Sequence, residues 1–500
     1  MEIKIVVEGQ EKEYSVISKG PISFVKVMEE LGLNFYRPCG GIGKCNRCAI
    51  RFVYGAPEIT SEDDRGLDFS DIRNGYRIGC QAIIDKDCKI QVPNSLVGEI
   101  KSPELFIKNL KPVDDDAAQK KIVVIDIGTT TIGIALVDEE TGDVVSTAST
   151  TNSQINFGAD VMSRIRAAIG GEADKLTSAV RGDMLIAAAK LHGNLSAVDT
   201  IVLSANTTMT HLVLGYPLDG MADYPFVPYS LEEKHFVEGG RNIYVAPGIS
   251  AFIGGDIVAG IYALDMLGKK ETSLLIDLGT NAELVLCDKD RLYCASAAAG
   301  PALEGGNISC GVPSIAGAIN HVELEKNLVK NLETIDNKSP IGICGSGVID
   351  VVYELLKNQI IDNGGLLIDE YVEKGFYLTE NVFITGEDIQ QVLLAKSAIR
   401  SAIDILVKEA KISLSDIKKV YVAGGLGASV RAEALAQIGL LPKELLNCYE
   451  AVGNTSLKGG IKFAFEKDLA AVKEIQSKAI VVELAGKPEF EKKFLENLYL

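Results

Sequence analysis

The first 20 residues of the chain alternate between apolar and polar side chains. Ile3, Ile5 and Val7 are separated by polar residues, and a second alternating run follows Gly9 and Gln10. Successive side chains of a strand point to opposite faces, so a period of two on both sides of a turn predicts a two-stranded hairpin.

The spacing of apolar residues changes after Pro21. Phe24, Val27 and Met28 lie three and four positions apart, which predicts an amphipathic helix that Pro21 opens and Gly32 ends. A loop with three cysteines and further short strands, predicted at residues 49–53 and 89–92, complete this region. The order of strand, strand, helix and strands is that of a β-grasp domain.

Residues 94–120 show little periodicity. They contain two prolines and a run of three aspartates, a composition that predicts a linker between domains. A new domain is expected to start near Lys121.

A strand–turn–strand pattern occurs twice in the rest of the chain. Each copy has an apolar run that ends at an aspartate, then a short Gly-Thr turn and a second apolar run; the two aspartates are Asp126 and Asp277. Copies about 150 positions apart are too widely separated for a solenoid, whose repeats are roughly 20 to 50 residues long. The pattern therefore predicts two similarly folded α/β lobes.

Composition narrows the class of protein. The chain has 500 residues, of which 47% are hydrophobic and 24% charged, and it has no apolar stretch as long as a membrane helix. We therefore expect a soluble, cytoplasmic multidomain enzyme. The net charge of −18 disfavours nucleic acid and anionic membranes as partners. In a reducing compartment the ten cysteines are expected as core residues or metal ligands rather than disulfides.

Three cysteines lie close together in the segment PCGGIGKCNRCAIRF. These are Cys39, Cys45 and Cys48, and a fourth, Cys80, follows in RIGCQA. Thiolates bind Fe-S clusters and zinc. The three glycines of the loop allow the backbone to fold tightly around a cluster and to direct N–H groups at its sulfurs, whereas zinc ribbons usually pair two CxxC motifs. The pattern favours a [2Fe-2S] cluster, and a zinc site and structural cysteines stay open as alternatives.

The first 92 residues resemble the [2Fe-2S] ferredoxin family, including the cysteine-glutamine pair at the last ligand. The resemblance implies that Cys39, Cys45, Cys48 and Cys80 bind the cluster. The five-residue gap between the first two cysteines is similar to adrenodoxin-like spacing, since plant-type members have four. Cys88, in the following strand, is expected as a packed core thiol.

No P-loop motif occurs in the chain, so other turns must hold phosphate. The turn after each repeated aspartate offers N–H and hydroxyl donors to phosphate, and the two carboxylates can hold Mg²⁺ directly or through water. Taken alone, such a turn is more often only a hairpin. The candidates are Gly128, Thr129 and Thr130 in the first copy and Gly279, Thr280 and Asn281 in the second.

A third glycine-rich element, KKVYVAGGLGASV, leads from a predicted strand into a helix. Its Gly424, Gly425 and Gly427 would allow close approach of a purine or ribose. Together the three elements resemble the phosphate-one, phosphate-two and adenosine motifs of the acetate and sugar kinase, heat-shock chaperone and actin (ASKHA) superfamily. Small-residue helices predicted after residues 254–256 and 453–460 resemble the two connecting helices of that superfamily.

Two further stretches resemble signatures of the reductive activators of corrinoid proteins, which are fusions of a ferredoxin and an ATPase. These stretches are AGPALEGGNISCG at residues 299–311 and GICGSGVID at residues 342–350. The resemblance covers nearly the whole chain, because cluster domain, linker and ASKHA domain follow in the same order. Some relatives have an additional middle domain, for which the predicted linker leaves no room.

The resemblance implies a multidomain α/β fold. An N-terminal β-grasp [2Fe-2S] ferredoxin-like domain is followed by a linker and a duplicated ribonuclease H-like (actin-like) two-lobed ATPase domain. The expected boundaries are 1–93, 94–120 and 121–500, with lobe one at about 121–272, lobe two at about 273–455 and a return segment at about 456–500.

The function implied by the resemblance is ATP-dependent reduction of a corrinoid protein, from Co(II) to Co(I), for a methyltransferase system. The implied cofactors are a [2Fe-2S] cluster, ATP and Mg²⁺; the implied partners are a corrinoid protein and an upstream electron donor. The oligomeric state, a homodimer included, stays open. Asp126 and Asp277 are expected to position Mg²⁺ and water. Asp256 and Glu304 are candidates for orienting the attacking water, weighed against roles as surface or hinge carboxylates.

Two other functions stay open at this point. One is a small-molecule kinase of the same superfamily with a redox-sensing ferredoxin, which stoichiometric phosphorylation of a metabolite would favour. The other is an electron-delivery module that does not hydrolyse ATP, which the absence of ATPase activity with the corrinoid protein present would favour.

Overall fold

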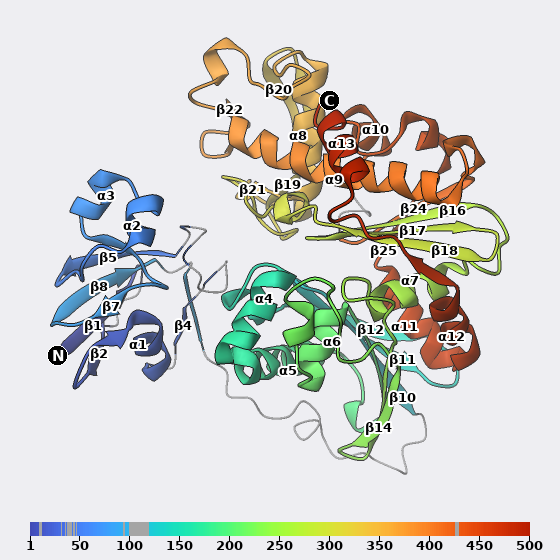
Figure 1. The fold of residues 1–500 in the computed structure, drawn as a ribbon, viewed down its shortest axis with the longest axis horizontal. Helices are drawn as coiled ribbons and strands as arrows, with labels where there is room; N and C mark the ends of the chain where they lie inside the picture. Colours follow the sequence, from blue (N-terminus) through green and yellow to red (C-terminus); the bar gives the residue numbers. More distant parts are fainter. Residues whose placement is uncertain are drawn as a thin grey trace. The chain divides into compact units, whose positions relative to one another are not determined.

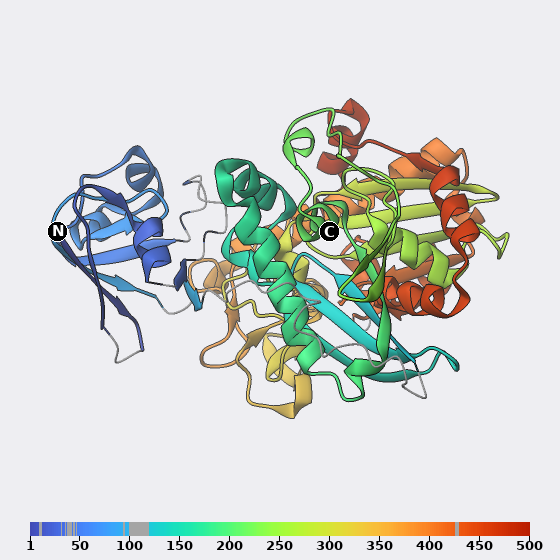
Figure 2. The ribbon, with the colours of Figure 1, turned by 90° about the horizontal axis from the view of Figure 1, so that it is seen from below.

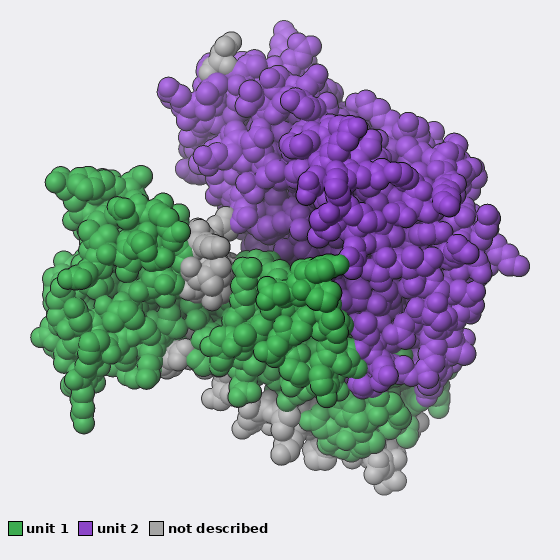
Figure 3. All heavy atoms as spheres, viewed as in Figure 1, with its two compact units in different colours: residues 1–230, 235–244 green, residues 231–234, 245–500 purple. Residues whose placement is uncertain are grey.

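A computed structural model describes residues 1–9, 13–31, 33–35, 37, 43, 46, 48–93, 96–99, 120–425 and 430–500. These residues form two compact units, shown in Figure 3. Unit one contains residues 1–230 and 235–244, and unit two contains residues 231–234 and 245–500. Both combine helices with mixed β-sheets (Figure 1).

A five-stranded sheet in the order β2-β1-β8-β5-β6 forms the N-terminal part of unit one. The predicted hairpin is the antiparallel pair β1 and β2, and β8 runs parallel to β1 on its other side. Ile3 and Ile5 of β1 are buried with Phe24 and Met28 of helix α1. This arrangement confirms the β-grasp fold. The elements are β1 (Glu2–Val7), β2 (Glu13–Ile17), β3 (Ile22–Ser23), α1 (Phe24–Glu30), β4 (Leu33–Phe35), β5 (Ala49–Tyr54), α2 (Ser61–Gly66), α3 (Phe69–Arg73), β6 (Tyr76–Ile78), β7 (Ile83–Ile84), β8 (Cys88–Val92) and β9 (Val97–Glu99).

The start of α1 differs from the prediction. Strand β3 lies between Pro21 and the helix, and the Ser23 hydroxyl accepts the Lys26 N–H at 3.3 Å. A serine just before a helix satisfies an N–H that has no partner within the helix. The helix therefore begins after Ser23, and Pro21 does not open it.

A six-stranded sheet forms the rest of unit one, in the order β12-β11-β10-β13-β15-β14. Helix α5 covers one face of this sheet (Figure 2). The strands are β10 (Lys121–Ile127), β11 (Thr131–Asp138), β12 (Val144–Thr151), β13 (Val198–Ala205), β14 (Lys234–Glu238) and β15 (Arg241–Val245). The helices are α4 (Val161–Ala167), α5 (Ala173–Ala189) and α6 (Thr207–Leu214), with a π-helical turn at Ala168–Glu172 between α4 and α5.

Unit two is built on a second six-stranded sheet, in the order β25-β24-β16-β17-β18-β26. Helix α9 lies on one face, and helices α7 and α11 lie on the other (Figure 1). The sheet strands are β16 (Ser273–Leu278), β17 (Ala282–Asp288), β18 (Arg291–Ala297), β24 (Lys419–Ala423), β25 (Tyr449–Gly453) and β26 (Ala479–Val481). The helices are α7 (Gly255–Leu264), α8 (Gly345–Lys357), α9 (Gly386–Ala410), α10 (Ala432–Gln437), α11 (Thr455–Glu466), α12 (Leu469–Lys478) and α13 (Pro488–Glu496). Shorter strands are β19 (Ala318–Glu325), β20 (Leu328–Thr334), β21 (Gly342–Ile343), β22 (Phe376–Tyr377) and β23 (Phe383–Ile384).

The two six-stranded sheets share one topology. In each sheet the first strand pairs antiparallel with the second and parallel with the fourth: β10 with β11 and β13, and β16 with β17 and β24. Asp126 and Asp277 are the second-last residues of the equivalent strands β10 and β16. The duplicated α/β fold that the sequence repeat predicts is therefore present.

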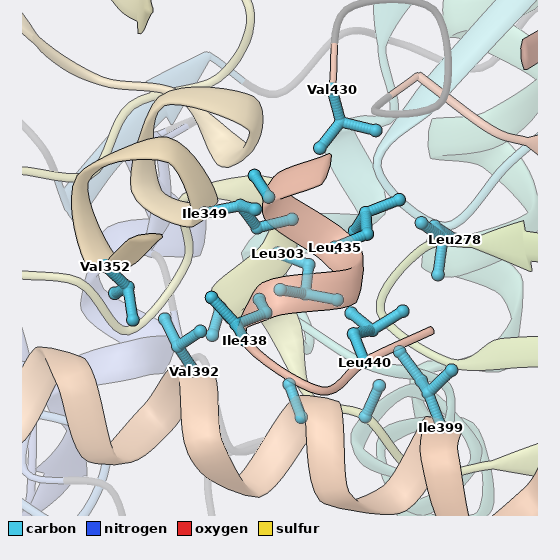
Figure 4. Packing of buried hydrophobic residues seen from close by; sticks show 14 of the residues in the cluster. Leu278, Leu303, Ile349, Val352, Val392, Ile399, Val430, Leu435, Ile438 and Leu440 are labelled. Carbon is cyan, nitrogen blue, oxygen red and sulfur yellow. The ribbon is translucent and has the colours of Figure 1, made fainter. Parts of the chain in front are cut away.

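A large apolar core fills the space between the unit two sheet and its helices. Figure 4 shows part of it, with Leu278 from the sheet, Ile349 from α8, Ile399 from α9 and Leu435 from α10. Val430, at the end of the glycine-rich segment after β24, belongs to the same core. Leu278, just before the predicted phosphate-two turn, and Val430, at the end of the glycine-rich segment, therefore pack into the same core.

The two small-residue helices predicted around residues 254–256 and 453–460 are α7 and α11, and they pack against each other. A side chain placed on Gly459 would put its Cβ 1.9 Å from the Ala259 carbonyl oxygen, and one on Gly260 would lie 2.9 Å from the Thr455 hydroxyl. Only glycine permits this approach of the two helix backbones.

Replacing Gly459 with alanine should therefore destabilise the protein. The steric overlap should cost roughly 3 kcal/mol against a gain in helix propensity of about 1 kcal/mol. The control is Gly182→Ala in α5, where a Cβ would meet no atom within 4 Å, so this variant should be slightly stabilised. Urea unfolding of both variants checks the prediction, and a Gly459→Ala protein as stable as wild type would contradict it.

The C-terminal segment docks on α9. The buried Lys396 ammonium donates to the Tyr499 carbonyl, and Asn497 donates to Ser401 at 3.0 Å. Burial lowers the pKa of Lys396 to about 8, and the nearby Arg400 adds to the shift. At pH values between the pKa of Lys396 in the folded protein and its ordinary value of 10.5, this lysine is therefore protonated more fully in the unfolded chain than in the folded protein.

Because of this difference, stability should rise with pH across that window. The contribution of Lys396 should reach about 3 kcal/mol at the alkaline end and should be absent below the folded pKa. Lys396→Met should remove this rise, whereas Lys408→Met, an exposed lysine on the same helix, should keep it. Denaturant unfolding of the three proteins at several pH values tests the prediction, and an unchanged slope in Lys396→Met would contradict it.

Candidate functional site

The lobe-one turn begins where β10 ends. The Gly128 N–H donates to the Thr131 carbonyl at 3.0 Å, and a Cβ on Gly128 would lie 2.8 Å from that oxygen. Side chains from outside the turn hold its carbonyls: Asn152 donates to Gly128 O at 2.9 Å and Arg164 donates to Thr129 O at 2.6 Å. The turn is therefore fixed by elements that lie well after it in the chain.

These contacts determine the direction in which the N–H groups of the turn point. In a trans peptide the N–H lies opposite the C=O, so the N–H groups of Thr129 and Thr130 point away from Asn152 and Arg164. Asn206 donates to the Thr129 hydroxyl at 3.1 Å, which fixes that side chain as well. Successive N–H groups of this kind are suited to an anion such as phosphate.

Arg164 is completely buried, with further hydrogen bonds to Gly158 O and Gln154 Oε1. Arg166, two residues later on the same helix, is exposed. Sequence reasoning missed Arg164, Asn152 and Asn206 as supports of the turn. The local pattern carries no signal for them, because α4 has two arginines and only the packing decides which one reaches the turn.

The lobe-two turn has a different environment. The Gly279 N–H donates to Asn281 O at 3.1 Å, and the Thr280 hydroxyl donates to Glu304 Oε2 at 2.5 Å. Gly424 lies against the same strand end, since a Cβ on it would be 2.9 Å from Asp277 Oδ1. The structure therefore brings the predicted phosphate-two and adenosine segments together within unit two.

Besides Glu304, three further carboxylates gather beside this turn. Glu283 of β17 stands opposite Asp277 of β16 in the sheet register. Burial raises the pKa of Glu283 well above its ordinary value, and the nearby charges of Asp256 and Asp277 raise it further, while Ser296 donates to it at 3.3 Å. Asp256, the second residue of α7, is close enough to Glu283 for its charge to raise the pKa of that carboxyl. Sequence reasoning missed Glu283, although a carboxylate inside an otherwise apolar strand was a usable signal.

The cysteine site is described in part. Cys48 precedes β5 and Cys80 follows β6, and because these strands are antiparallel both cysteines lie at the same end of the pair. The Gly79 N–H donates to Cys48 O at 2.9 Å, and Gln81 Nε2 donates to Cys80 Sγ at 3.6 Å. Cys39, Cys45 and also Gly427 of the adenosine segment lie outside the described residues.

Gly43, the residue that the structure describes between the first two cysteines, lies beside Gln81. Gly43 has a φ of +72°, and a Cβ on it would lie 2.9 Å from the Gln81 side chain. A bulkier residue would also clash at Gly79, whose Cβ would be 2.7 Å from the Phe35 ring. Close packing at Gly43 and Gly79 beside the two described thiols, Cys48 and Cys80, fits a cluster site.

Other cysteines have the properties of packed thiols. Burial raises the pKa of Cys88 to about 11, and also raises those of Cys287 and Cys294, to about 11 and 12. A thiol in such surroundings stays protonated and is a poor metal ligand. The prediction that Cys88 is a core residue is confirmed.

Among the residues that the structure describes, no group of three or more His, Cys, Asp or Glu side chains is arranged as a closed metal site. In the same part of the chain, none of the helices has the length and apolar composition needed to cross a bilayer.

Two family models match the chain. One, described as the C-terminal domain of RACo, the ASKHA domain, matches residues 271–500; the other, described as the RACo middle region, matches residues 122–269. A region of this family called the middle region is therefore present, contrary to the expectation that the linker leaves no room for it. It lies between the predicted linker and the matched C-terminal ASKHA domain, over residues that the sequence predicted as lobe one.

Relatives match over most of the chain. The corrinoid activation enzyme RamQ of Eubacterium limosum is 28% identical over 583 aligned positions, covering 97% of each chain. The [Co(II) methylated amine-specific corrinoid protein] reductase of Methanosarcina barkeri is 28% identical over 395 positions, covering 69% of this chain and 70% of the relative. A solved structure of a reductive activator for a corrinoid, iron-sulfur protein superposes with a TM-score of 0.71 at 26% identity, covering 100% of this chain and 98% of that one.

Proposed function

Because the chain belongs to the reductive activators of corrinoid proteins, we propose that it couples ATP hydrolysis to the one-electron reduction of a partner's corrinoid from Co(II) to Co(I). The observation that carries this proposal is the combination, in one chain, of a β-grasp domain with paired cysteines and a duplicated fold with an Asp-Gly-Thr turn in each lobe.

We assign the cluster to the four thiolates of Cys39, Cys45, Cys48 and Cys80. The common end of β5 and β6 and the approach of Gly43 to Gln81 support this set. A [2Fe-2S] cluster bound there would supply the single electron at low potential. The chain's own contribution is to place the Gln81 amide beside the Cys80 sulfur.

We assign the nucleotide to the two turns and the adenosine segment. In lobe one Asn152 and Arg164 hold the carbonyls of the turn, so that the N–H groups of Thr129 and Thr130 point away from them, which suits phosphate at Gly128, Thr129 and Thr130. In unit two the turn at Gly279, Thr280 and Asn281 is surrounded by carboxylates, which suits a cation shared with phosphate. Gly424, Gly425 and Gly427 are assigned to the adenosine. These different surroundings support different roles for the two turns: the first would bind phosphate, and the second would bind phosphate together with a cation.

The carboxylates have separate proposed roles. Asp126 and Asp277, at equivalent strand ends, position Mg²⁺ and water. Asp256 stays a candidate for orienting the attacking water, because it lies near Asp277 through Glu283. Glu304 accepts a hydrogen bond from the Thr280 hydroxyl. Its proposed role is therefore to fix the Thr280 side chain in the orientation that contacts phosphate.

ATP is required on energetic grounds. For a one-electron couple each 59 mV of unfavourable difference in potential costs about 1.4 kcal/mol, so a ferredoxin-type donor reduces Co(II) only if another process supplies free energy. Binding and hydrolysis of ATP would supply it, by favouring a state of this chain that contacts the corrinoid protein differently. The partners are then the corrinoid protein and an upstream reductant.

The test is anaerobic mixing of the reconstituted, reduced protein with a Co(II) corrinoid protein. We expect the Co(I) absorption band to appear with MgATP and to be absent, or much slower to appear, without it or with excess EDTA. Rapid Co(I) formation without nucleotide would point to an electron-delivery module that does not hydrolyse ATP. No Co(I), together with a phosphorylated metabolite, would point to a kinase.

A further inference from the structure

One arginine of the N-terminal β-grasp domain, the cluster domain, binds lobe one. Arg37 lies two residues after strand β4, and its Nη2 lies 2.5 Å from Glu172 Oε2, in the π-helical turn after α4. Its backbone N–H also donates to Asn156 O at 3.0 Å, and its guanidinium lies over the Phe157 ring at 5.6 Å. All four residues belong to unit one, so the contacts join two parts of one compact unit.

The ion pair between Arg37 and Glu172 is largely withdrawn from water. The two side chains are 11% and 16% exposed, so solvent and salt screen their charges less than those of a surface pair. Glu172 Oε1 has a second, looser neighbour in the exposed Lys175 ammonium at 3.7 Å. Arg37 Nε is buried without a hydrogen-bond partner among the residues that the structure describes, which costs free energy. The contact therefore combines a charged attraction with a penalty, and such a balance permits both a docked and a released state.

The cluster-domain end of this contact leads to the described thiols. Phe35, the last residue of β4, is buried in the core of the domain, with its ring centroid 4.8 Å from that of Phe24. A Cβ on Gly79 would lie 2.7 Å from the Phe35 ring, and the Gly79 N–H donates to Cys48 O at 2.9 Å. Arg37 therefore extends from side chains that pack beside the proposed cluster site.

The lobe-one end of the contact leads to the phosphate-one turn. The 3-10 helix Ser153–Asn156 ends at the residue that accepts the Arg37 N–H, and it is capped by Asn152, which donates to Gly128 O in the turn at 2.9 Å. A glutamine of the same helix binds Arg164 of α4, which holds the second carbonyl of the turn. The π-helical turn that supplies the ion-pair carboxylate continues directly from α4. Arg37 thus contacts the same two elements that hold the phosphate-one turn.

We infer that Arg37 is a positioning residue that couples the phosphate-one turn to the cluster domain, so that phosphate at the turn and the docked arginine stabilise each other. This inference rests on the proposed function, in which the turn binds MgATP. The docked arginine fixes both supports of the turn at their far ends, so less ordering is left to be done when nucleotide binds. Thermodynamic linkage requires the converse: bound nucleotide strengthens the docking of Arg37 by the same factor.

The coupling regulates how firmly the electron carrier is attached to lobe one. Arg37 acts in this scheme through the elements that it contacts, and it takes no part in the chemistry at either site. Nucleotide in the turn holds the cluster domain docked, and departure of phosphate after hydrolysis weakens that hold.

The first test uses Glu172→Gln in the full chain. The amide keeps the size of the side chain but not its charge, so the ion pair is lost. We expect the Kd for MgATP to rise about fivefold, with the visible spectrum of the cluster unchanged. One control is Lys175→Gln, which removes the other cation beside Glu172. A second is Arg51→Gln, which removes an exposed arginine that donates to Asn74 O, at 3.4 Å, within the cluster domain itself. Both controls should bind MgATP with wild-type affinity, and an equal loss in either would contradict the inference.

A second measurement follows docking directly. The Arg37 amide donates to Asn156 O only when the arginine is docked, so its hydrogen exchange, read by mass spectrometry, reports the docked population. We expect saturating MgATP to slow this exchange about fivefold in the wild-type protein. In Glu172→Gln the amide should exchange faster, and MgATP should no longer slow it.

A double-mutant cycle with Arg37→Gln tests whether the two residues act through each other. Coupling through the ion pair predicts that the double variant loses no more affinity for MgATP than either single variant, and losses that multiply would contradict it. If Glu172→Gln lowers the melting temperature but leaves the Kd and the response of the Arg37 amide unchanged, the pair is merely structural and the inference is wrong. Wild-type protein that fails to bind MgATP would instead overturn the proposed function.

Discussion

Replacing Cys48 with serine should abolish reductive activation. Cys48 is buried at the end of the β5–β6 pair where Cys80 also lies, and a serine hydroxyl is a poor substitute for a thiolate as an iron ligand. We expect the visible absorption of the cluster to disappear, iron and sulfide to be lost, and Co(I) formation to fall by roughly 100-fold or more. MgATP should still bind with wild-type affinity, because its proposed site lies in other domains.

The matched control is Cys88→Ser. Cys88 belongs to the same domain and is fully buried, and its raised pKa keeps it a protonated thiol. This variant should lose some stability but keep its iron content and spectrum. An intact cluster in Cys48→Ser, or loss of the cluster in Cys88→Ser, would show that the ligand set is wrong. Zinc in place of iron in the wild-type protein would remove the redox half of the proposal.

Replacing Asp277 with asparagine should suppress ATP hydrolysis while leaving the cluster spectrum unchanged. Asp277 ends the central strand β16, lies against Gly424 and stands opposite Glu283. In the proposed site this carboxylate positions Mg²⁺ and water, so with its charge lost we expect ATP turnover to fall by about 100-fold. Anaerobic phosphate release measured with saturating corrinoid protein checks this, and Co(I) formation should fall in parallel.

The control for Asp277 is Asp288→Asn at the far end of the neighbouring strand β17, where the carboxylate accepts the Thr272 hydroxyl at 2.9 Å. It should keep wild-type turnover. Unchanged hydrolysis in Asp277→Asn would exclude Asp277 from the site. Loss of hydrolysis with normal Co(I) formation would separate the two activities and contradict their coupling.

The two Asp-x-Gly-Thr turns have similar backbones and different surroundings. Both turns follow the first strand of an equivalent sheet, so the backbone geometry is shared. Arg164 supports the first turn through a carbonyl, whereas Glu304 supports the second through a hydroxyl. Donors around one turn and carboxylates around the other give opposite local electrostatics, which suits an anion in one place and a cation in the other.

The sequence alone determined the features that depend on neighbouring residues. The hairpin and helix of the N-terminal domain follow from periods of two and about 3.6 residues, and the duplication follows from a repeated strand–turn–strand pattern. The cysteine spacing and the glycine-rich turns are equally local. These signals survive folding because backbone geometry and side-chain alternation are set within a few residues.

Only the tertiary structure decided which side chains support those turns. Arg164 lies 35 positions from its partner Thr129, and Arg37 lies 135 positions from Glu172. Each contact is made by an arginine that the packing of separate elements brings to its partner. No local sequence pattern distinguishes these arginines from neighbouring charged residues. Likewise Glu283 and Asp256 meet near Asp277 only because α7 packs against the sheet. Sheet pairing and helix packing bring distant residues together, so the chemistry of the site is determined by long-range contacts even where its backbone is determined locally.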